Sequence, residues 1–289
     1  MASFFGFARG RMATPAADAL RPHRPLNDRS PAELAALISG EVIPRMVALS
    51  RPQADIIDLA AQNPHISAAD IDGLIPLVLD LDSTGLHERI DQLVARGVTN
   101  EALLIDLIAP LARRLGRLWE EDRCDFIDVT MGIWRLQELV HELGARRPCR
   151  ANDPAAARRA LFATMPGDHH GFATVLIAEV FSGRGWQADR LGDVAMSDIS
   201  KCLASASYDL VGLTVTSTCH MAPLPSVIRA LRSVSINPRL VILVGGYAIG
   251  GDHAQALAMG ADGTAGDARE AAVLAERLVD AARLPQAGI

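Results

Sequence analysis

The sequence predicts an α/β domain with a five-stranded, doubly wound parallel sheet, preceded by an all-α helical bundle. From Ser30 to Arg147 apolar residues recur every three or four positions, which is the period of amphipathic helices. From residue 158 short continuous apolar runs alternate with helical stretches, which is typical of a parallel sheet covered on both faces. A segment rich in Arg and Pro, residues 147–154, separates the two patterns.

Four regions are therefore expected along the chain. Residues 1–29 mix Phe, Arg and Pro without a sustained period and are expected to form a flexible tail. They lack the continuous apolar stretch of a signal peptide. A helical cap domain is expected at 30–147, a linker at 148–157 and the α/β domain at 158–289.

The cap domain is predicted to hold four or five helices joined by short connections, as in a compact bundle. Ser30-Pro31-Ala32-Glu33 and Thr99-Asn100-Glu101 both place an acidic residue shortly after a polar cap, which is typical of helix starts. Gly85 and Gly97 separate the shorter helices. The expected helices are 31–49, 67–80, 86–96, 100–121 and 126–146.

The C-terminal pattern predicts a flavodoxin-like, Rossmann-type sheet. The strands are expected at 160–165, 187–191, 210–216, 240–244 and 262–265, of which the second and the last have the weaker pattern. The helices between and after them are expected at 171–184, 222–235, 253–259 and 268–282. Sheets of this kind bind ligands beyond the carboxyl ends of their strands, so a site is expected in the loops that follow the strands.

Composition excludes several classes of protein. The chain has 289 residues, 49% of them hydrophobic, and no apolar run reaches the roughly 20 residues that span a bilayer. A formal net charge of -6 argues against the basic face that neutralises DNA phosphates. The four cysteines have neither C-x-x-C nor zinc-ligand spacing, so they are expected to be reduced thiols of a cytoplasmic protein.

The loops after the first, third and fourth predicted strands carry the polar and glycine residues expected of a site. The first loop contains Asp168-His169-His170, the second runs from Thr214 to His220, and the third is Gly245-Gly246-Tyr247. No G-x-G-x-x-G follows the first strand and no P-loop motif occurs in the chain. Dinucleotide-binding and P-loop proteins are therefore excluded.

Asp168 and His170 have the spacing of a metal ligand and its support. An imidazole just past a strand can coordinate a metal through one nitrogen, while a carboxylate accepts the hydrogen bond of the other nitrogen. The glycine pair Gly245-Gly246 removes side chains where a bulky group must approach the backbone. Together these loops predict a ligand with a metal centre and a long appendage along the sheet.

These loops resemble the signature of the cobalamin-binding family. Asp168-x-His170 matches the start of D-x-H-x-x-G, Gly245-Gly246 matches the GG of the family, and Gly260–Gly263 resembles its usual close. Thr214-x-Thr216 stands where the family has S-x-L. Ala173 replaces the last glycine of the first motif, so the match to that motif is incomplete.

The resemblance implies that His170 is the lower cobalt ligand and replaces the dimethylbenzimidazole of the cofactor. Asp168 would orient His170, and His169 would be the ligand instead if the register is shifted by one. The tail would lie beside the glycine pair, so a bulky residue at Gly246 is expected to block the tail and leave the fold intact. The residues implied in cofactor binding are Asp168, His170, Gly171, Thr214, Thr216, Gly245, Gly246, Tyr247 and Trp119. The form of the cofactor, hydroxocobalamin, methylcobalamin or adenosylcobalamin, is left open.

The helical half resembles the cap over the upper face of cobalamin in corrinoid proteins and light-dependent regulators. The run Leu115–Trp119 carries this resemblance and implies that Trp119 covers the upper ligand. The adenosylcobalamin photoreceptor repressors have a Glu-His pair where this chain has Val129 and Thr130, a departure from their binding mode.

The run Leu118–Gln137 is similar to the AerR/PpaA group, cobalamin-binding regulators of photosynthesis genes in purple bacteria. That similarity implies a light-responsive antirepressor that is not an enzyme and acts on a PpsR/CrtJ-like repressor. The alternative is a corrinoid methyl-carrier protein of a methyltransferase system, which shares both domains. No helix-turn-helix module is visible, so a protein partner is expected and a direct DNA contact is left open.

Several of these residues also have a simpler interpretation. Asp168-His169-His170 spells the DHH triplet of a metal phosphoesterase, but such an enzyme needs further aspartates around a metal pair. Trp119 and Trp134 have helical spacing and both fit a packed core, which is the favoured interpretation for Trp134. His220 is interpreted as a surface residue, and Cys219 as a small buried residue or a redox-active thiol.

Overall fold

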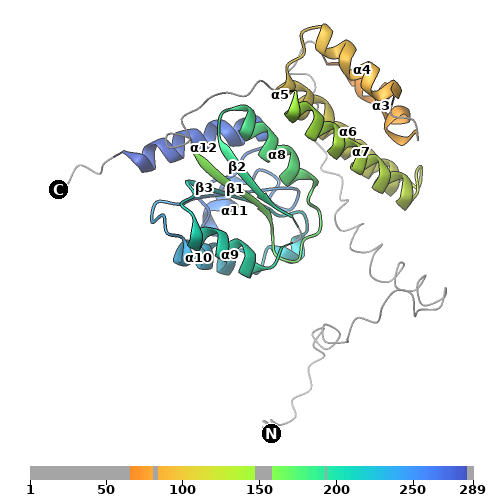
Figure 1. Ribbon diagram of the computed structural model, residues 1–289. Coiled ribbons are helices and arrows are strands. Elements are labelled where there is room, and N and C mark those ends of the chain that lie inside the picture. Colours follow the sequence, from red (N-terminus) through yellow and green to blue (C-terminus); the bar gives the residue numbers. More distant parts are fainter. Residues whose placement is uncertain (1–65, 81–83, 147–157, 193, 285–289) are drawn as a thin grey trace, which may run out of the picture. The chain divides into compact units, whose positions relative to one another are not determined.

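The computed structural model describes residues 66–80, 84–146, 158–192 and 194–284, all of which fall in one compact unit. They form a helical half and an α/β half (Figure 1). The tail, the helix at 31–49 and the linker predicted from the sequence lie outside the described residues. No helix in these ranges is long and apolar enough to cross a membrane.

The four helices predicted between residues 67 and 146 are present. They are α3 (Ala68–Leu79), α4 (Thr84–Ala95), a long helix over residues 100–120, and α7 (Phe126–Ala145). The long helix consists of α5 (Asn100–Ala102), a π-helical segment η5 (Leu103–Ile108) and α6 (Ala109–Glu120). Thr99 starts it as predicted, because its hydroxyl accepts the N–H of Ala102 at 3.2 Å.

Pro110 explains the π-helical segment, which the sequence did not predict. Proline has no N–H, and its ring crowds the carbonyl of the residue four positions earlier, here Asp106. The wider π turn ends at Ile108, two residues before this proline, and relieves the crowding. All six residues of the segment are buried, so the turn carries the Asp106 carboxylate into the interior.

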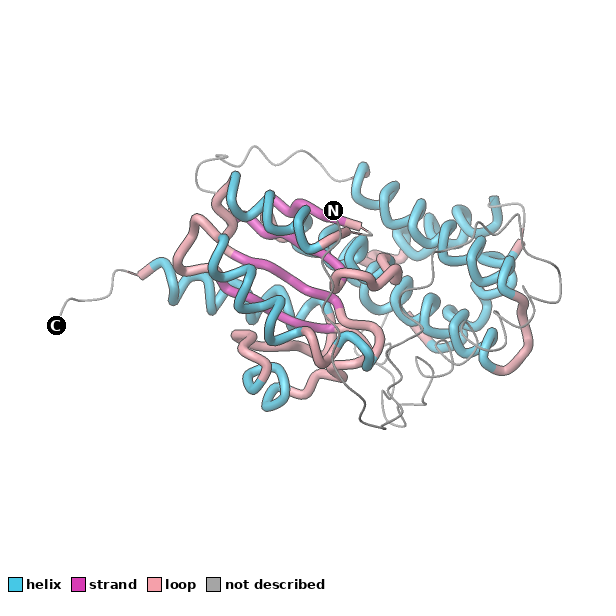
Figure 2. The backbone as a smooth tube through the Cα atoms, turned by 90° about the horizontal axis from the view of Figure 1, so that it is seen from below, coloured by secondary structure: helices cyan, strands magenta, loops and turns pink. Residues whose placement is uncertain are grey.

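The α/β half is a parallel sheet with the strand order β2-β1-β3-β4. The strands are β1 (Arg159–Thr164), β2 (Gln187–Leu191), β3 (Leu210–Thr214) and β4 (Val241–Gly245). The helices after them are α8 (Phe172–Gly183), α9 (Met196–Ser205), α10 (Leu224–Val234), α11 (His253–Ala258) and α12 (Ala268–Arg283), with a short 3-10 turn at Thr218–His220. Helices α8 and α12 pack on one face of the sheet, and α9 and α10 on the other (Figure 1). Figure 2 shows the strands side by side, seen from below.

The predicted fifth strand at 262–265 is wrong. This segment forms a single parallel bridge, between Leu243 and Gly263, beside β4. The carboxylate of Asp262 accepts the N–H of Ile242 at 2.6 Å, a bond that a neighbouring strand would supply from its backbone. The same carboxylate lies 2.8 Å from Arg232. Two backbone hydrogen bonds join the segment to β4, from Asp262 to Ile242 at 2.8 Å and from Val244 to Gly263 at 3.1 Å, so the pairing is limited to this one bridge.

Helix α9 is an element that the sequence reasoning missed. Its start carries a recognisable signal, because the carboxylate of Asp198 accepts the N–H of Ala195 at 3.2 Å. Ile199 and Leu203 lie four residues apart and are both fully buried, so they form the apolar face of the helix. The remaining predicted helices of the α/β half are confirmed.

Helix α8 belongs to two cores at once and joins the two halves. Ala178 and Phe181 pack on the sheet, whereas Val175, Leu176 and Val180 belong to the apolar core of the helical half. On the other side of this joint Leu139, Val140 and Leu143 of α7 are all buried. The joint is therefore an apolar helix packing rather than a loose hinge.

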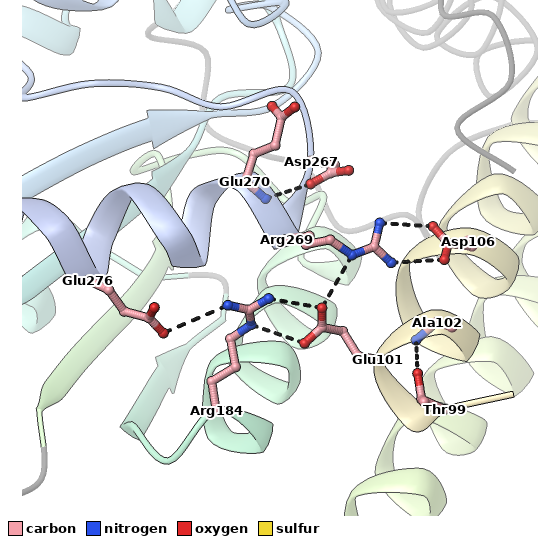
Figure 3. A network of polar contacts seen from close by, with 9 residues as sticks. All are labelled: Thr99, Glu101, Ala102, Asp106, Arg184, Asp267, Arg269, Glu270 and Glu276. Carbon is pink, nitrogen blue, oxygen red and sulfur yellow. Dashed lines mark hydrogen bonds and ion pairs between the residues drawn. The ribbon is translucent and has the colours of Figure 1, made fainter. Parts of the chain in front are cut away.

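A polar network continues this joint (Figure 3). The carboxylate of Glu101 accepts two hydrogen bonds from Arg184 at 3.0 Å and one from Arg269 at 3.3 Å. Arg269 also donates to both oxygens of Asp106, at 2.8 and 3.3 Å. Burial acts to raise the pKa of Glu101, but the hydrogen bonds and charges of the two arginines outweigh it and lower this pKa. The helical half is thus held to both α8 and α12.

Candidate functional site

Asp168 lies buried after β1 and holds His170. Its side chain accepts the His170 N–H at 3.1 Å, and Oδ1 lies 2.9 Å from Nδ1 of the imidazole. The N–H of Asp168 donates to the carbonyl of Met165 at 2.8 Å, so the backbone turn also fixes the carboxylate. The carboxylate–imidazole contact predicted from the spacing is therefore present.

Thr216, in the loop after β3, fixes the second oxygen of the same carboxylate. Its hydroxyl donates to Oδ2 of Asp168 at 2.6 Å and its N–H donates to the same atom at 3.0 Å. The hydroxyl also lies 3.2 Å from Nδ1 of His170. The resemblance implied a cofactor contact for Thr216, whereas the structure places its hydroxyl on Asp168.

These contacts determine which nitrogen of His170 is available. Burial alone would raise the pKa of Asp168, but the hydrogen bonds from His170 and Thr216 outweigh it and hold this pKa far below its ordinary value. An ionised carboxylate accepts the hydrogen of Nδ1, so the lone pair of the neutral ring is on Nε2. Nε2 makes no hydrogen bond to the described residues, and half of the side chain is exposed.

A single imidazole is suited to a metal that brings its other ligands with it. Across the described ranges no group of three or more His, Cys, Asp or Glu side chains could hold a metal ion. A free divalent ion needs several protein ligands, whereas a metal in a macrocycle needs only an axial one. The described residues thus fit an axial ligand and lack the cluster that the phosphoesterase interpretation requires.

Gly245 and Gly246 have different reasons to be glycine. Gly246 has a φ of 104°, and a Cβ there would lie 2.6 Å from the carbonyl oxygen of Val215. The turn itself therefore requires Gly246, and the expectation that a bulky residue is tolerated there is wrong. At Gly245, by contrast, a Cβ would meet no atom within 4 Å. The open space that an appendage could fill lies beside Gly245.

Buried hydroxyls without partners lie close to this space. The strand register aligns Thr164 with Thr214 and Thr214 with Gly245, so all three residues point to the same face of the sheet. The hydroxyl of Thr164 is buried and has no hydrogen-bond partner among the described residues, and the same holds for Thr264. Within the described part of the chain, the hydroxyl of Thr214 reaches only the carbonyl of Ala163, at 3.5 Å. Such hydroxyls fit a polar ligand that enters from the carboxyl edge.

Thr164 and Thr264 were not identified from the sequence. The signal at Thr164 is a hydroxyl residue at the end of an otherwise apolar strand, next to the strand that ends in Thr214. No comparable signal marks Thr264, because its burial depends on how the segment before α12 packs.

The other predicted residues surround this edge. Gly171 caps α8, and Tyr247 follows β4 with 38% of its surface exposed. His169 is exposed. A Cβ at Gly167 would lie 3.8 Å from the His220 ring, so His220 lies beside the His170 loop. Cys219 is exposed, so the expectation of a buried residue is wrong.

The two tryptophans of the helical half differ from each other. Trp119 is half-buried on the last turn of α6, and its role over the cofactor stays a prediction. Trp134 is 52% exposed on α7, so its assignment to the core is wrong.

Comparison with known proteins identifies relatives of the α/β half and of the larger part of the chain. A family model for the B12 binding domain matches residues 158–275. The chain is 30% identical over 173 residues to an uncharacterized 20.5 kDa protein in the bchF-crtJ intergenic region of Rhodobacter capsulatus, covering 60% of this chain and 89% of that protein. It is 24% identical over 215 residues to dimethylamine corrinoid protein 3 of Methanosarcina acetivorans, covering 73% of this chain and 99% of that protein.

A solved structure supports the fold. The monomethylamine corrinoid protein of Methanosarcina barkeri matches with a TM-score of 0.58 and 20% sequence identity. The match covers 72% of this chain and 98% of that chain. The arrangement of helical region and parallel sheet is therefore one that a corrinoid protein adopts.

Proposed function

Because the chain belongs to the B12-binding domain family, we propose that its cobalamin serves as a sensor and that the protein regulates transcription. In this proposal it is an antirepressor that acts on a PpsR/CrtJ-like repressor of photosynthesis genes. The observation that carries the proposal is the 30% identity to the protein encoded between bchF and crtJ, which is consistent with the AerR/PpaA type. The protein would act in the cytoplasm and would not be an enzyme.

The residues of the site have distinct tasks in this function. His170 would offer Nε2 to the cobalt, and Asp168 and Thr216 hold its ring through Nδ1. Gly245, Thr164 and Thr214 leave room and hydroxyl groups for the tail. Bound cobalamin supplies a cobalt centre whose upper ligand light can release or exchange. Trp119 is proposed to cover that upper face.

The joint between the halves supports a sensing role. Helix α8 begins directly after the His170 loop and packs on both the sheet and α7. A change in the cofactor that moves α8 therefore also acts on the helical half. Such a ligand shifts a conformational equilibrium only by its differential affinity for the two states, typically about 1–3 kcal/mol.

The second candidate is a corrinoid methyl-carrier protein. The match to dimethylamine corrinoid protein 3, which covers 99% of that protein, favours it. A carrier would exchange a methyl group with a methyltransferase and would need no repressor. The two candidates therefore differ in their partner rather than in their cofactor.

Immobilised PpsR/CrtJ-type repressor distinguishes these candidates. We expect the purified protein to bind the repressor more tightly with hydroxocobalamin than without it, with a difference of about 5- to 150-fold. The measurement is made in darkness and after illumination, with His170→Ala as the control that lacks the axial ligand. Equal repressor binding by wild type and His170→Ala would show that cobalamin does not control this interaction. No binding by the wild type under any condition would favour the methyl carrier.

A further inference from the structure

An exposed apolar stripe runs along α7. Ile127, Met131 and Trp134 follow one another at spacings of four and three residues, so they lie on one side of the helix. Their exposed fractions are 68%, 38% and 52%. Three large apolar side chains in helical register form an apolar face against which a partner helix can pack. Single exposed apolar residues are ordinary, but a contiguous set marks an interaction site.

The stripe does not face α8. Gly144, near the end of α7, contacts Glu179 of α8, which shows which side of α7 is turned to the α/β half. At 3.6 residues per turn, Ile127, Met131 and Trp134 lie roughly 80–140° further round the helix axis. At Gly132 a Cβ would meet Leu115 of α6 at 2.9 Å, so α6 lies on yet another side. Arg135, which donates to the carbonyl of Val78 of α3, lies roughly 180° from Gly144. The stripe thus lies between the side of α7 that faces α8 and the side that faces α3.

The charges around the stripe are acidic. The acidic residues at its two ends and beside it are Glu120, Glu121, Asp122, Asp125, Asp128 and Glu138. The two arginines of this stretch are engaged, because Arg123 pairs with Glu121 at 3.3 Å and the buried Arg135 donates to the carbonyl of Val78 at 2.6 Å. A second copy of the chain would bring like charges together. A partner with basic flanks would instead meet a complementary surface.

We propose that the stripe Ile127–Met131–Trp134 is the docking surface for the DNA-reading helix of the repressor. The inference rests on the proposed function, which makes a repressor the partner. A helix that enters a DNA groove carries basic side chains that neutralise phosphates, and it can also present exposed apolar side chains that contact the methyl group of thymine. The basic groups match the acidic surroundings of the stripe, and the exposed apolar groups match the stripe itself. Capture of this helix on α7 would compete directly with operator DNA.

Substitutions in the stripe test this assignment against a matched control. Ile236 is 54% exposed in the loop after α10, so Ile236→Ser removes a similar exposed apolar surface outside the stripe. Repressor affinity is measured with cobalamin bound. We expect Trp134→Ala and Ile127→Ser each to weaken binding about 10- to 100-fold, as for central anchors of an interface, and Ile236→Ser to leave it unchanged. Glu138→Gln should slow association, and the wild-type association rate should fall with rising salt.

Operator DNA provides the second measurement. Added operator DNA should displace the protein from the repressor. The displaced fraction should rise with the fraction of DNA-reading helices that are bound to operator. Binding of operator and protein at the same time would show that another part of the repressor occupies the stripe, and would overturn the assignment.

The remaining outcomes separate the docking surface from the proposed function. Equal repressor binding by Trp134→Ala and wild type overturns the stripe and leaves the antirepressor function standing, whereas no binding by the wild type overturns both. Loss of the cobalamin spectrum in Trp134→Ala would mean that the stripe covers the cofactor. Loss of a wild-type dimer in this variant would mean that a second copy is the occupant. A large fall in its unfolding temperature would mean that the chain itself covers the stripe.

Discussion

At the scale of single residues, the His170 imidazole depends on two loops that are distant in the sequence. Asp168 precedes it by two positions, and Thr216 comes from the loop after the neighbouring strand β3. The threonine occupies a position where the family has leucine, yet it supplies two of the donors to the buried carboxylate. The departure from the family pattern therefore strengthens the support of the histidine.

His170→Ala should abolish cobalamin binding or shift the absorption spectrum of the bound cofactor, whereas His169→Ala should retain the wild-type spectrum. Asp168→Asn should weaken binding about 10- to 100-fold, because it removes the charge that orients the ring. Absorption titration with hydroxocobalamin checks all three. The opposite behaviour of the two histidine variants would move the ligand by one residue.

The two glycines after β4 should respond differently to the same substitution. Gly245→Leu should fold normally and bind cobalamin more weakly, because its side chain enters open space at the carboxyl edge. Gly246→Leu should lose about 1–3 kcal/mol of stability, because of its positive φ and its contact with Val215. Thermal unfolding and cobalamin titration of both variants separate the effects. Unchanged affinity in a folded Gly245→Leu variant would contradict the tail assignment.

At the scale of elements, helix α8 and the long helix 100–120 connect the site to the helical half. The π turn places Asp106 inside, where Arg269 of α12 binds both of its oxygens. Glu101, one turn earlier, links Arg269 to Arg184 at the end of α8. The joint between the two halves therefore depends on the charge of Glu101.

Glu101→Gln should destabilise the protein by about 1 kcal/mol at neutral pH, a modest value because a third of the side chain is exposed. The folded pKa of Glu101 lies below its ordinary value of 4.5, so its contribution is present above that value and is lost as the pH falls through the folded pKa. The difference between variant and wild type should therefore shrink in acid. Urea unfolding at pH 7 and below pH 4 measures it, and a difference independent of pH would contradict the role of the charge.

At the scale of the whole molecule, the proposed input is light acting on bound cobalamin. The absorption spectrum of the loaded protein should change on illumination. Trp119→Ala should alter the rate of photoconversion at least about twofold, with a moderate loss of about 1–3 kcal/mol in stability because the residue is partly buried. Recovery of the absorption spectrum in darkness checks the photoconversion, and thermal unfolding checks the stability. Identical dark and illuminated spectra with every form of cobalamin would leave cobalamin supply as the input.

The sequence by itself determined the elements and the chemistry of individual residues. The helical period predicted the four described helices of the cap, the apolar runs predicted β1, β3 and β4, with β2 predicted from a weaker pattern, and Asp168-x-His170 predicted a carboxylate–imidazole pair. These features depend on neighbours close in the chain. The buried face of a helix or strand can be predicted from the order of the residues, and so can a contact between residues two positions apart.

Only the tertiary structure decided which distant groups meet. The contact of Thr216 with Asp168 spans 48 positions, and that of Arg269 with Asp106 spans 163. The segment predicted as a fifth strand forms only a single bridge to β4 among the described residues, and the exposure of Trp134 follows from which sides of α7 its neighbours cover. Periodicity shows that a residue can be buried, but register and packing determine what lies against it, because those depend on all the elements together.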